Sequence, residues 1–125
     1  MPGQAYRLRV RHKVWLDAAG RFALGDGGVE LLGAIDATGS IRAAAQKVGW
    51  SYRHTLAYLT TAERGLGYPI VERARGGHER GGAQLTPKGK DFLRRYGVFR
   101  RRLDAALDRL SRSVLTVGAH HASAR

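Results

Sequence analysis

The sequence predicts a mainly α-helical fold with small β-hairpins and a long C-terminal helix. Three observations support this: apolar residues recur at helical spacing in several stretches, period-two alternation is confined to short segments, and glycines separate the stretches. With 125 residues, 43% of them hydrophobic, the chain fits one domain with its own core. We therefore expect the order hairpin, three helices, hairpin, long helix.

The first hairpin is expected over residues 6–24. From Tyr6 to Leu16 the even positions are mainly apolar and most odd positions are basic, which is the alternation of a half-buried strand. Asp17 to Gly20 supply a turn, after which the chain can return as a second strand.

Three helices are expected next, over residues 27–38, 40–48 and 51–64. Each contains apolar residues at helical spacing, and Ser40 and Ser51 are good N-caps for the second and third helices. Glycines that follow the apolar positions are suited to end them.

A second hairpin is expected over residues 69–86, with a glycine-rich basic tip. Thr86 followed by Pro87 is a typical helix start, and the periodic pattern then predicts a long helix over residues 87–113. Residues 114–125 have no pattern and are expected to form a flexible tail.

Apolar residues of the long helix follow a heptad-like spacing. Such a seam can pack on the domain's own core, but a helix of about 26 residues spans roughly 39 Å, which is longer than so small a core needs. We therefore favour dimerisation through this helix. The residues expected in the dimer contact are Phe92, Tyr96, Phe99, Leu103 and Leu110.

The charge of the chain indicates a polyanionic partner. Twenty-two Lys and Arg against ten Asp and Glu give a net charge of +12, which favours nucleic acid over an anionic membrane surface. A merely solvated basic surface is the alternative. No cysteine is present and no stretch approaches the length of a membrane span, so we expect a soluble cytoplasmic protein without disulfides.

No catalytic arrangement is apparent. The five histidines are scattered, HExxH is absent, and neither a GK[ST] nor a GxGxxG phosphate loop occurs. We expect no enzyme activity, no metal site and no cofactor.

The second and third helices, the tight turn at Gly49 and the following basic hairpin have the layout of a winged helix-turn-helix. Alanines 43–45 permit a close helix crossing. In DNA-binding members of this class, the first turn of the second helix of the pair meets base edges and phosphates. Here that turn carries Tyr52, Arg53 and His54. An ordinary helical hairpin with Tyr52 and His54 on its surface is the competing interpretation.

The expected DNA contacts fall into two groups, the helix pair and the wing. Arg53 has the donor geometry to read a guanine, and the wing arginines can reach phosphates or the minor groove. The full set is Ser40, Arg42, Ser51, Tyr52, Arg53, His54, Tyr58, Arg73, Arg75, Gly76, Gly77, His78 and Arg80.

Three stretches resemble the N-terminal DNA-binding domain of ModE-type molybdate-responsive regulators, which is related to the LysR-type winged helix. They are VWLDAAGRFALGDGGVELLGAIDATGSI, AAAQKVGWSYRHTLAYL and VERARGGHERGGAQLTPKGKDFL, and the resemblance covers roughly two thirds of the chain. It implies that residues 51–54 begin the recognition helix, that residues 73–82 form the wing, and that dimers join through the first strands and the long helix. ModE proteins carry molybdate-binding domains after that helix. This chain ends at Arg125, so we expect it to have none of its own.

The functional expectation is a sequence-specific, DNA-binding transcription regulator. As a homodimer it would bind an inverted-repeat site in double-stranded DNA, with recognition helices about 34 Å apart. An architectural, nucleoid-associated DNA-binding protein and a module that docks on another protein through the long helix are the alternatives.

Overall fold

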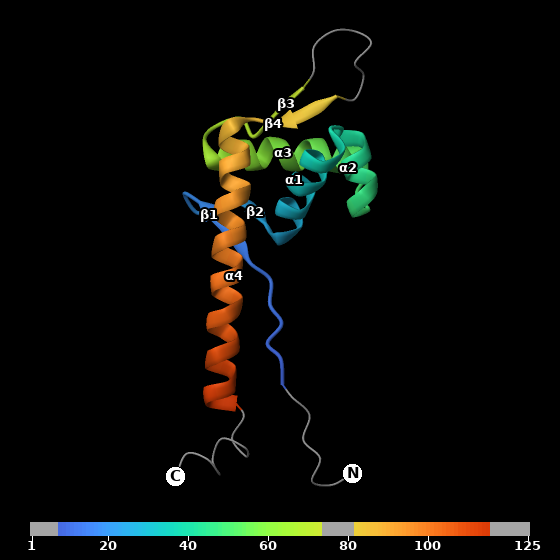
Figure 1. The fold of residues 1–125 in the computed structure, drawn as a ribbon. Coiled ribbons are helices and arrows are strands. Elements are labelled where there is room, and N and C mark those ends of the chain that lie inside the picture. The colour runs from blue at the N-terminus through green and yellow to red at the C-terminus, as the bar shows by residue number, and fades with distance from the viewer. Residues whose placement is uncertain (1–7, 74–81, 116–125) are drawn as a thin grey trace, which may run out of the picture. The chain divides into compact units, whose positions relative to one another are not determined.

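The computed structural model describes residues 8–73 and 82–115, which form two compact units. One unit consists of residues 13–96. The other combines residues 8–12 with residues 97–115 among those described. In chain order the elements are β1 (Trp15–Ala18), β2 (Arg21–Gly25), α1 (Asp26–Thr38), α2 (Ile41–Val48), α3 (Tyr52–Leu66), β3 (Val71–Arg73), β4 (Ala83–Leu85) and α4 (Pro87–Leu115) (Figure 1).

β1 and β2 form an antiparallel hairpin that is shorter than the sequence indicates. Trp15 pairs with Gly25 and Ala18 with Arg21, across a turn in which Ala19 and Gly20 have φ values of 53° and 76°. Positive φ at both central residues is the geometry that matches the twist of a two-residue hairpin.

The prediction of a strand was wrong for residues 8–14, while residues 6 and 7 lie outside the described part of the chain. The reason is the length of the return strand. β2 has five residues and α1 follows it directly, so β2 offers no further ladder positions to the preceding chain. The exposure of residues 11–18 still alternates along this extended segment.

Serine caps start α2 and α3 as predicted. The hydroxyl of Ser40 accepts the N–H of Ala43, and the hydroxyl of Ser51 accepts that of His54, both at 3.0 Å. Gly49 ends α2 with φ 82°, a left-handed conformation that glycine adopts without steric cost.

α3 continues two residues beyond its expected end. Gly65 stays helical because α3 passes directly over β2 at this position: a Cβ on Gly65 would lie 2.6 Å from the Cβ of Ala23. The helix ends at Leu66, and Gly67 follows in the left-handed conformation. Gly65 therefore serves close packing rather than termination.

The base of the wing is attached to both neighbouring helices. Ser40 forms an antiparallel bridge with Gly82, and the N–H of Ala83 donates to the carbonyl of Gly39 at 2.9 Å. On the other side the carboxylate of Glu63 accepts the N–H groups of Ile70 and Val71. This second attachment was not expected from the sequence.

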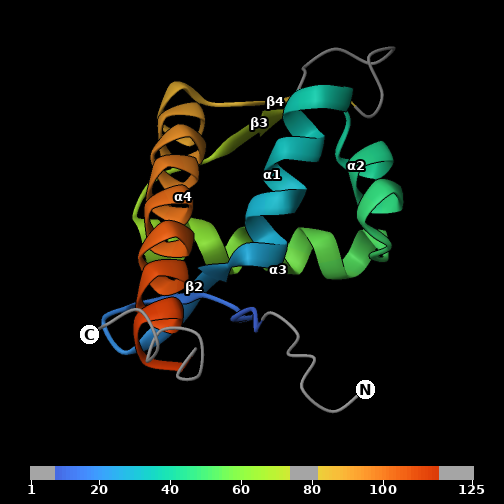
Figure 2. The ribbon, with the colours of Figure 1, turned by 60° about the horizontal axis from the view of Figure 1, so that its bottom comes forward.

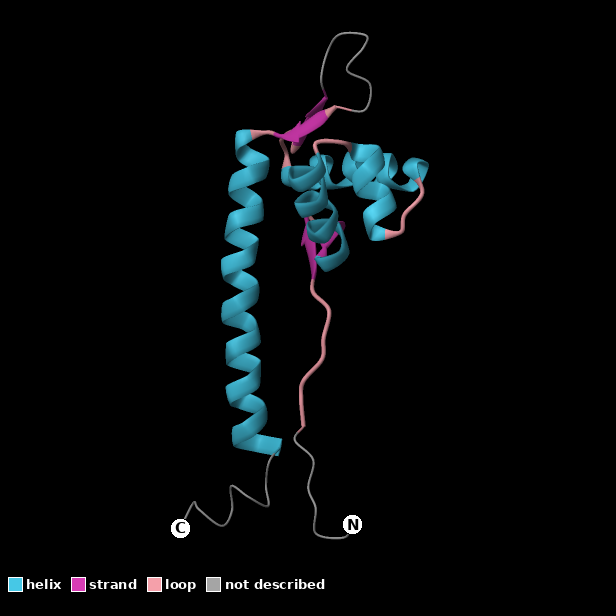
Figure 3. Cartoon of the chain, turned by 45° about the vertical axis from the view of Figure 1, so that its right-hand side comes forward, coloured by secondary structure: helices cyan, strands magenta, loops and turns pink. Residues whose placement is uncertain are grey.

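The core of the 13–96 unit lies between α1, β2, α3 and the wing base. Figure 2 shows α2 beside α1 and α3 crossing near the N-terminal end of α1. The largest fully buried side chains are Leu24, Leu31, Leu32, Ile35, Ile70, Leu85 and Thr55. The small hairpins among the helices are visible in Figure 3. The predicted fold class, mainly α with small β-hairpins, is confirmed.

Asp26 joins three segments within this unit. Its Oδ2 accepts the N–H of Val14 at 3.1 Å, its own N–H donates to the Val14 carbonyl, and its Oδ1 accepts the hydroxyl of Tyr96 from α4.

In the other unit, Arg100 and Asp104 of α4 contact His12, whose Nε2 lies 2.7 Å from Arg100 Nη1. The helix ends at Leu115, two residues later than predicted.

Replacing Gly65 with alanine is expected to destabilise the protein by about 1–3 kcal/mol, because the new methyl group overlaps Ala23. Gly33→Ala in α1 is the matched control. Its Cβ meets nothing within 4 Å, so the gain in helix propensity should stabilise the protein by about 0.5–1 kcal/mol. Urea unfolding of both variants measures the two free energies; destabilisation of equal size in both would contradict this account of α3 packing.

Candidate nucleic-acid interface

The turn between α2 and α3 fixes how the two helices meet. The N–H of Trp50 donates to the carbonyl of Ala45 at 2.9 Å, so the chain reverses directly over the end of α2. Ala44 and Ala45 are buried, in agreement with the expected role of small side chains at the crossing. α3 consequently begins at the edge of the unit with its first turn accessible.

Ser51, Arg53 and His54 are exposed on this first turn, and Tyr52 is partly buried. They surround the N-terminus of α3, where unpaired backbone N–H groups and the helix dipole favour an anion. The structure therefore brings together four of the predicted DNA contacts.

Tyr52 is also joined to α2. The guanidinium carbon of Arg42 lies 4.0 Å from the centre of the Tyr52 ring, a cation–π contact between two exposed helix starts. Both residues were predicted individually, but nothing in the spacing predicted their contact. The contact places a basic group of α2 next to the first turn of α3.

The ring of His54 packs against Trp50, with ring centroids 4.7 Å apart. Trp50 in turn lies 5.0 Å from Tyr58, and Phe22 of β2 packs edge-on against Tyr58 at 5.8 Å. This row of rings connects the exposed His54 to the hairpin, so His54 has a preferred side-chain orientation.

Tyr58 was expected to contact the DNA backbone, and the structure turns its side chain inward instead. Its hydroxyl accepts the N–H of Gly25 at 2.9 Å, and the ring fills the space above Gly28. Burial raises the pKa of the Tyr58 hydroxyl, although the backbone hydrogen bonds of Gly25 and Gly28 act in the opposite direction. The residue lies two turns beyond Ser51, where α3 already faces β2.

The wing is described only at its base. Ser40 uses its hydroxyl to cap α2 and its backbone to pair with Gly82, while Arg73 is exposed at the end of β3. The remaining predicted wing contacts, namely Arg75, Gly76, Gly77, His78 and Arg80, lie outside the described residues.

The charges around α2 and the start of α3 have one sign. No aspartate or glutamate occurs in residues 37–62, whereas Arg42, Lys47 and Arg53 do. All three are exposed. This face therefore attracts anions without competition from acidic side chains on α2 or on the first ten residues of α3.

No family model matches the sequence. The molybdenum transport protein ModE of Azotobacter vinelandii is 38% identical over 103 residues, which cover 82% of this chain and 38% of that protein. The molybdenum-pterin-binding protein MopB of Rhodobacter capsulatus is 44% identical over 70 residues, which cover 56% of this chain and 26% of MopB. The matched stretches thus span well under half of these relatives.

Among solved structures, the DNA-binding domain of CbnR in its complex with DNA is similar. Its TM-score is 0.51 with 26% identity, and the match covers 78% of this chain and 95% of that one. The winged helix-turn-helix of this protein is of the ModE type. The predicted relation of this ModE-type domain to LysR-type DNA-binding domains is also confirmed.

The heptad-like seam of the ModE-type domain divides into two parts. Tyr96 is 5% exposed and bonded to Asp26, and Phe92 packs on the core beside it, so these two residues cover their own domain. The first turns of α4 thus help to close the 13–96 core, and the dimer contacts predicted for Phe92 and Tyr96 stay predictions. Phe99 and Leu110 are 45% and 59% exposed, and Leu103 is partly buried.

The described parts of the chain contain no group of three or more His, Cys, Asp or Glu that could hold a metal ion. They also contain no helix both long and apolar enough to cross a membrane.

Tyr58→Phe is expected to lower the free energy of unfolding by about 1 kcal/mol at pH 7, because the Gly25 N–H loses its acceptor. The pKa of Tyr58 is raised in the folded state, so its contribution is complete below the ordinary value of 10.0 and is lost as the pH rises through the folded-state value. The deficit of the variant relative to wild type should therefore shrink above pH 10.

Tyr52→Phe is the control, since the Tyr52 hydroxyl forms no hydrogen bond within the described residues. Urea unfolding from pH 7 to 11 measures both variants. A Tyr58→Phe deficit that stays constant over this range would contradict the assigned environment of Tyr58.

Proposed function

We propose that the protein is a DNA-binding transcription regulator that reads a specific sequence through the first turn of α3. The observation that carries this proposal is the accessible helix start at Ser51, surrounded by Arg53, His54 and the Arg42–Tyr52 pair on an acid-free face. The similarity to the CbnR complex with DNA and to the ModE relatives supports the same function.

In this proposal α3 enters the major groove with its N-terminal turn toward the base edges. The guanidinium fork of Arg53 can donate two parallel hydrogen bonds to O6 and N7 of a guanine. Ser51 and the start of α3 would hold a phosphate, and Arg42 would hold another while it orients Tyr52. His54 is held by Trp50 at the edge of this contact.

The wing supplies the flanking contacts. Arg73 extends from β3, and the base of the wing is paired with the start of α2 through Ser40 and Gly82. The wing-tip contacts remain predictions, as does the contact from Ser40. Tyr58 is not part of the proposed DNA surface, because its hydroxyl is engaged with Gly25.

We further propose a homodimer that binds an inverted repeat. The exposed part of the seam, Phe99 and Leu110 together with the partly buried Leu103, is the proposed contact between subunits. A role without catalysis and a cytoplasmic location also stay predictions. The net charge of +12 favours sequence-independent coating of DNA as a second candidate function.

Arg53→Ala is expected to weaken binding to the preferred site by about 1–3 kcal/mol, because a bidentate guanine contact is lost. Arg53→Lys is the matched variant that keeps the charge but not the fork. It should lose sequence preference while it retains most of its affinity for unrelated DNA. The preferred site is obtained by sequencing duplex fragments selected by the purified protein, and affinities are then measured at fixed salt.

If the selection enriches no sequence, and both variants bind every duplex with equal affinity, the result would support the DNA-coating function and contradict the sequence-specific one. Enrichment of a single half-site would instead contradict the inverted repeat.

The double substitution Phe99→Ser and Leu110→Ser is expected to shift the protein from dimer to monomer, because both side chains are exposed on the proposed seam. Ala105→Ser, exposed and off the seam, is the control and should leave the dimer intact. Size-exclusion chromatography with light scattering measures the mass. If wild type has the mass of one chain, or the double variant that of two, the proposed contact is wrong.

A further inference from the structure

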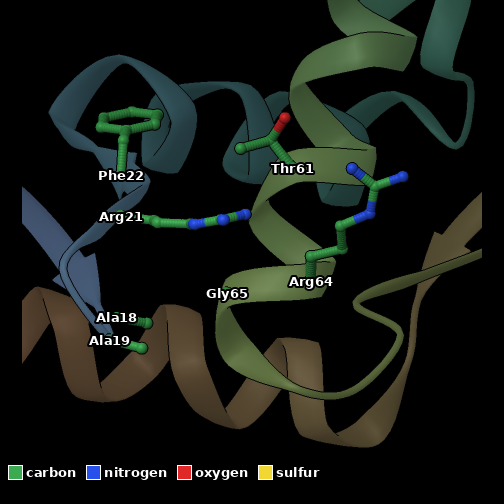
Figure 4. A pocket seen from close by; sticks show the side chains of 7 residues that line it. All are labelled: Ala18, Ala19, Arg21, Phe22, Thr61, Arg64 and Gly65. Carbon is green, nitrogen blue, oxygen red and sulfur yellow. The ribbon is translucent and has the colours of Figure 1, made fainter.

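A hollow of about 440 Å³ lies on the side of α3 that faces the β1–β2 hairpin. It is formed by the hairpin turn, the start of β2 and the C-terminal half of α3 (Figure 4). The residues that line it are Ala18, Ala19, Arg21, Phe22, Thr61, Arg64 and Gly65. None of them forms part of the DNA surface proposed above.

Small residues create this space. Gly65 has no side chain, and its backbone is held against Ala23 of β2, so the helix and the strand are in direct contact beneath the hollow. Ala18 and Ala19 extend only a methyl group toward it, with Ala19 in the left-handed conformation of the turn. Phe22 adds an aromatic wall that is fixed by its contact with Tyr58.

Two arginines stand at the hollow. Figure 4 shows the side chain of Arg21 reaching from β2 toward α3, and that of Arg64 running along α3 toward the turn that carries Thr61. Within the described residues neither guanidinium has an ion pair or a hydrogen bond. On α4, by contrast, Asp91 accepts hydrogen bonds from Arg94 and Arg95.

The lining combines an apolar floor with a few polar groups, which is typical of sites for small molecules, and its volume falls in the range of such sites, roughly 300–1,000 Å³. Two guanidinium groups favour an oxyanion that accepts paired hydrogen bonds. A bare inorganic ion would leave the wall of Phe22 and the alanines without a partner. The chemistry thus fits an acid with an apolar or aromatic body.

We propose that this hollow binds a small organic acid, whose anionic group lies between Arg21 and Arg64 and whose body packs against Phe22. Thr61 can add a hydroxyl donor. By helix rise, Arg64 lies about 17 Å along α3 from Arg53, so the bound acid would not occupy the DNA-reading turn. The site would therefore allow a ligand and DNA to be bound together.

The test is a titration of the full chain with sodium benzoate, followed by two-dimensional amide NMR in the absence of DNA. Saturable shifts are expected at residues 18–22 and 61–65. Arg21→Gln and Arg64→Gln should each weaken binding by about tenfold, since each removes a charge-assisted hydrogen bond. Arg102→Gln removes the same charge from an exposed position on α4 and should leave binding unchanged.

Probes of related chemistry complete the experiment. Phenyl phosphate distinguishes a phosphate ester from a carboxylate as the preferred anionic group, and binding of either one supports the site. Benzyl alcohol and acetate, which each lack one half of the ligand, should bind much more weakly.

No saturable shift with either acid, or equal weakening in Arg102→Gln, would overturn the proposal. A separate titration with duplex DNA alone would also overturn the proposal if DNA shifted these amides while neither acid did, and if the effect of DNA were lost in Arg21→Gln and Arg64→Gln. Because the acid titrations contain no DNA, their failure is distinguishable from failure of the proposed DNA-binding function.

Discussion

The start of α1 is the point on which the arrangement of the 13–96 unit depends. There the carboxylate of Asp26 accepts hydrogen bonds from the chain before β1 and from Tyr96 of α4, while the helix dipole of α1 favours its negative charge. One residue earlier, the N–H of Gly25 donates to Tyr58 of α3. Two adjacent residues thus connect the hairpin, α4 and α3 to a single place in the core.

As a result, the two ends of α3 have different surroundings. Its first turn is exposed and carries polar and basic groups, whereas Tyr58 and Gly65 hold the following turns against β2 and the start of α1. Neighbours from outside the helix order two side chains of this turn: Arg42 orders Tyr52, and Trp50 orders His54. Preorganisation of this kind lowers the entropy that must be lost when a partner binds.

Local signals predicted the helices well, because their starts and ends are determined by nearby residues. Ser40 and Ser51 cap their helices by their own side chains, and Gly49 lies where the backbone requires a left-handed residue. The first strand was predicted too long for the opposite reason. Alternation reports which side chains are buried, but a strand also needs a partner, and β2 is too short to pair with residues 8–14.

The sequence predicted which residues lie on the first turn of α3, but it did not predict the contacts that these residues and their neighbours form. The cation–π contact of Arg42 with Tyr52 joins residues on two helices. The hydrogen bonds that Glu63 accepts from Ile70 and Val71 depend on where β3 begins. Neither interaction follows from the spacing of residues in the sequence. Tyr58 and Tyr96 illustrate the same limit. Both lie on an amphipathic helix, and the pattern does not say whether such a residue packs on its own domain or on a partner. In the structure both hydroxyls form hydrogen bonds within the domain, Tyr58 with Gly25 and Tyr96 with Asp26.

The bridge between Ser40 and Gly82 has a consequence for how this architecture can vary. Gly82 at the base of the wing is paired with Ser40, the residue that caps α2. The position of the wing base is therefore set by the helix pair and not by the sequence between β3 and β4. A change in the length or charge of that intervening segment would therefore leave the base of the wing in place, because Gly39 and Ser40 hold it there.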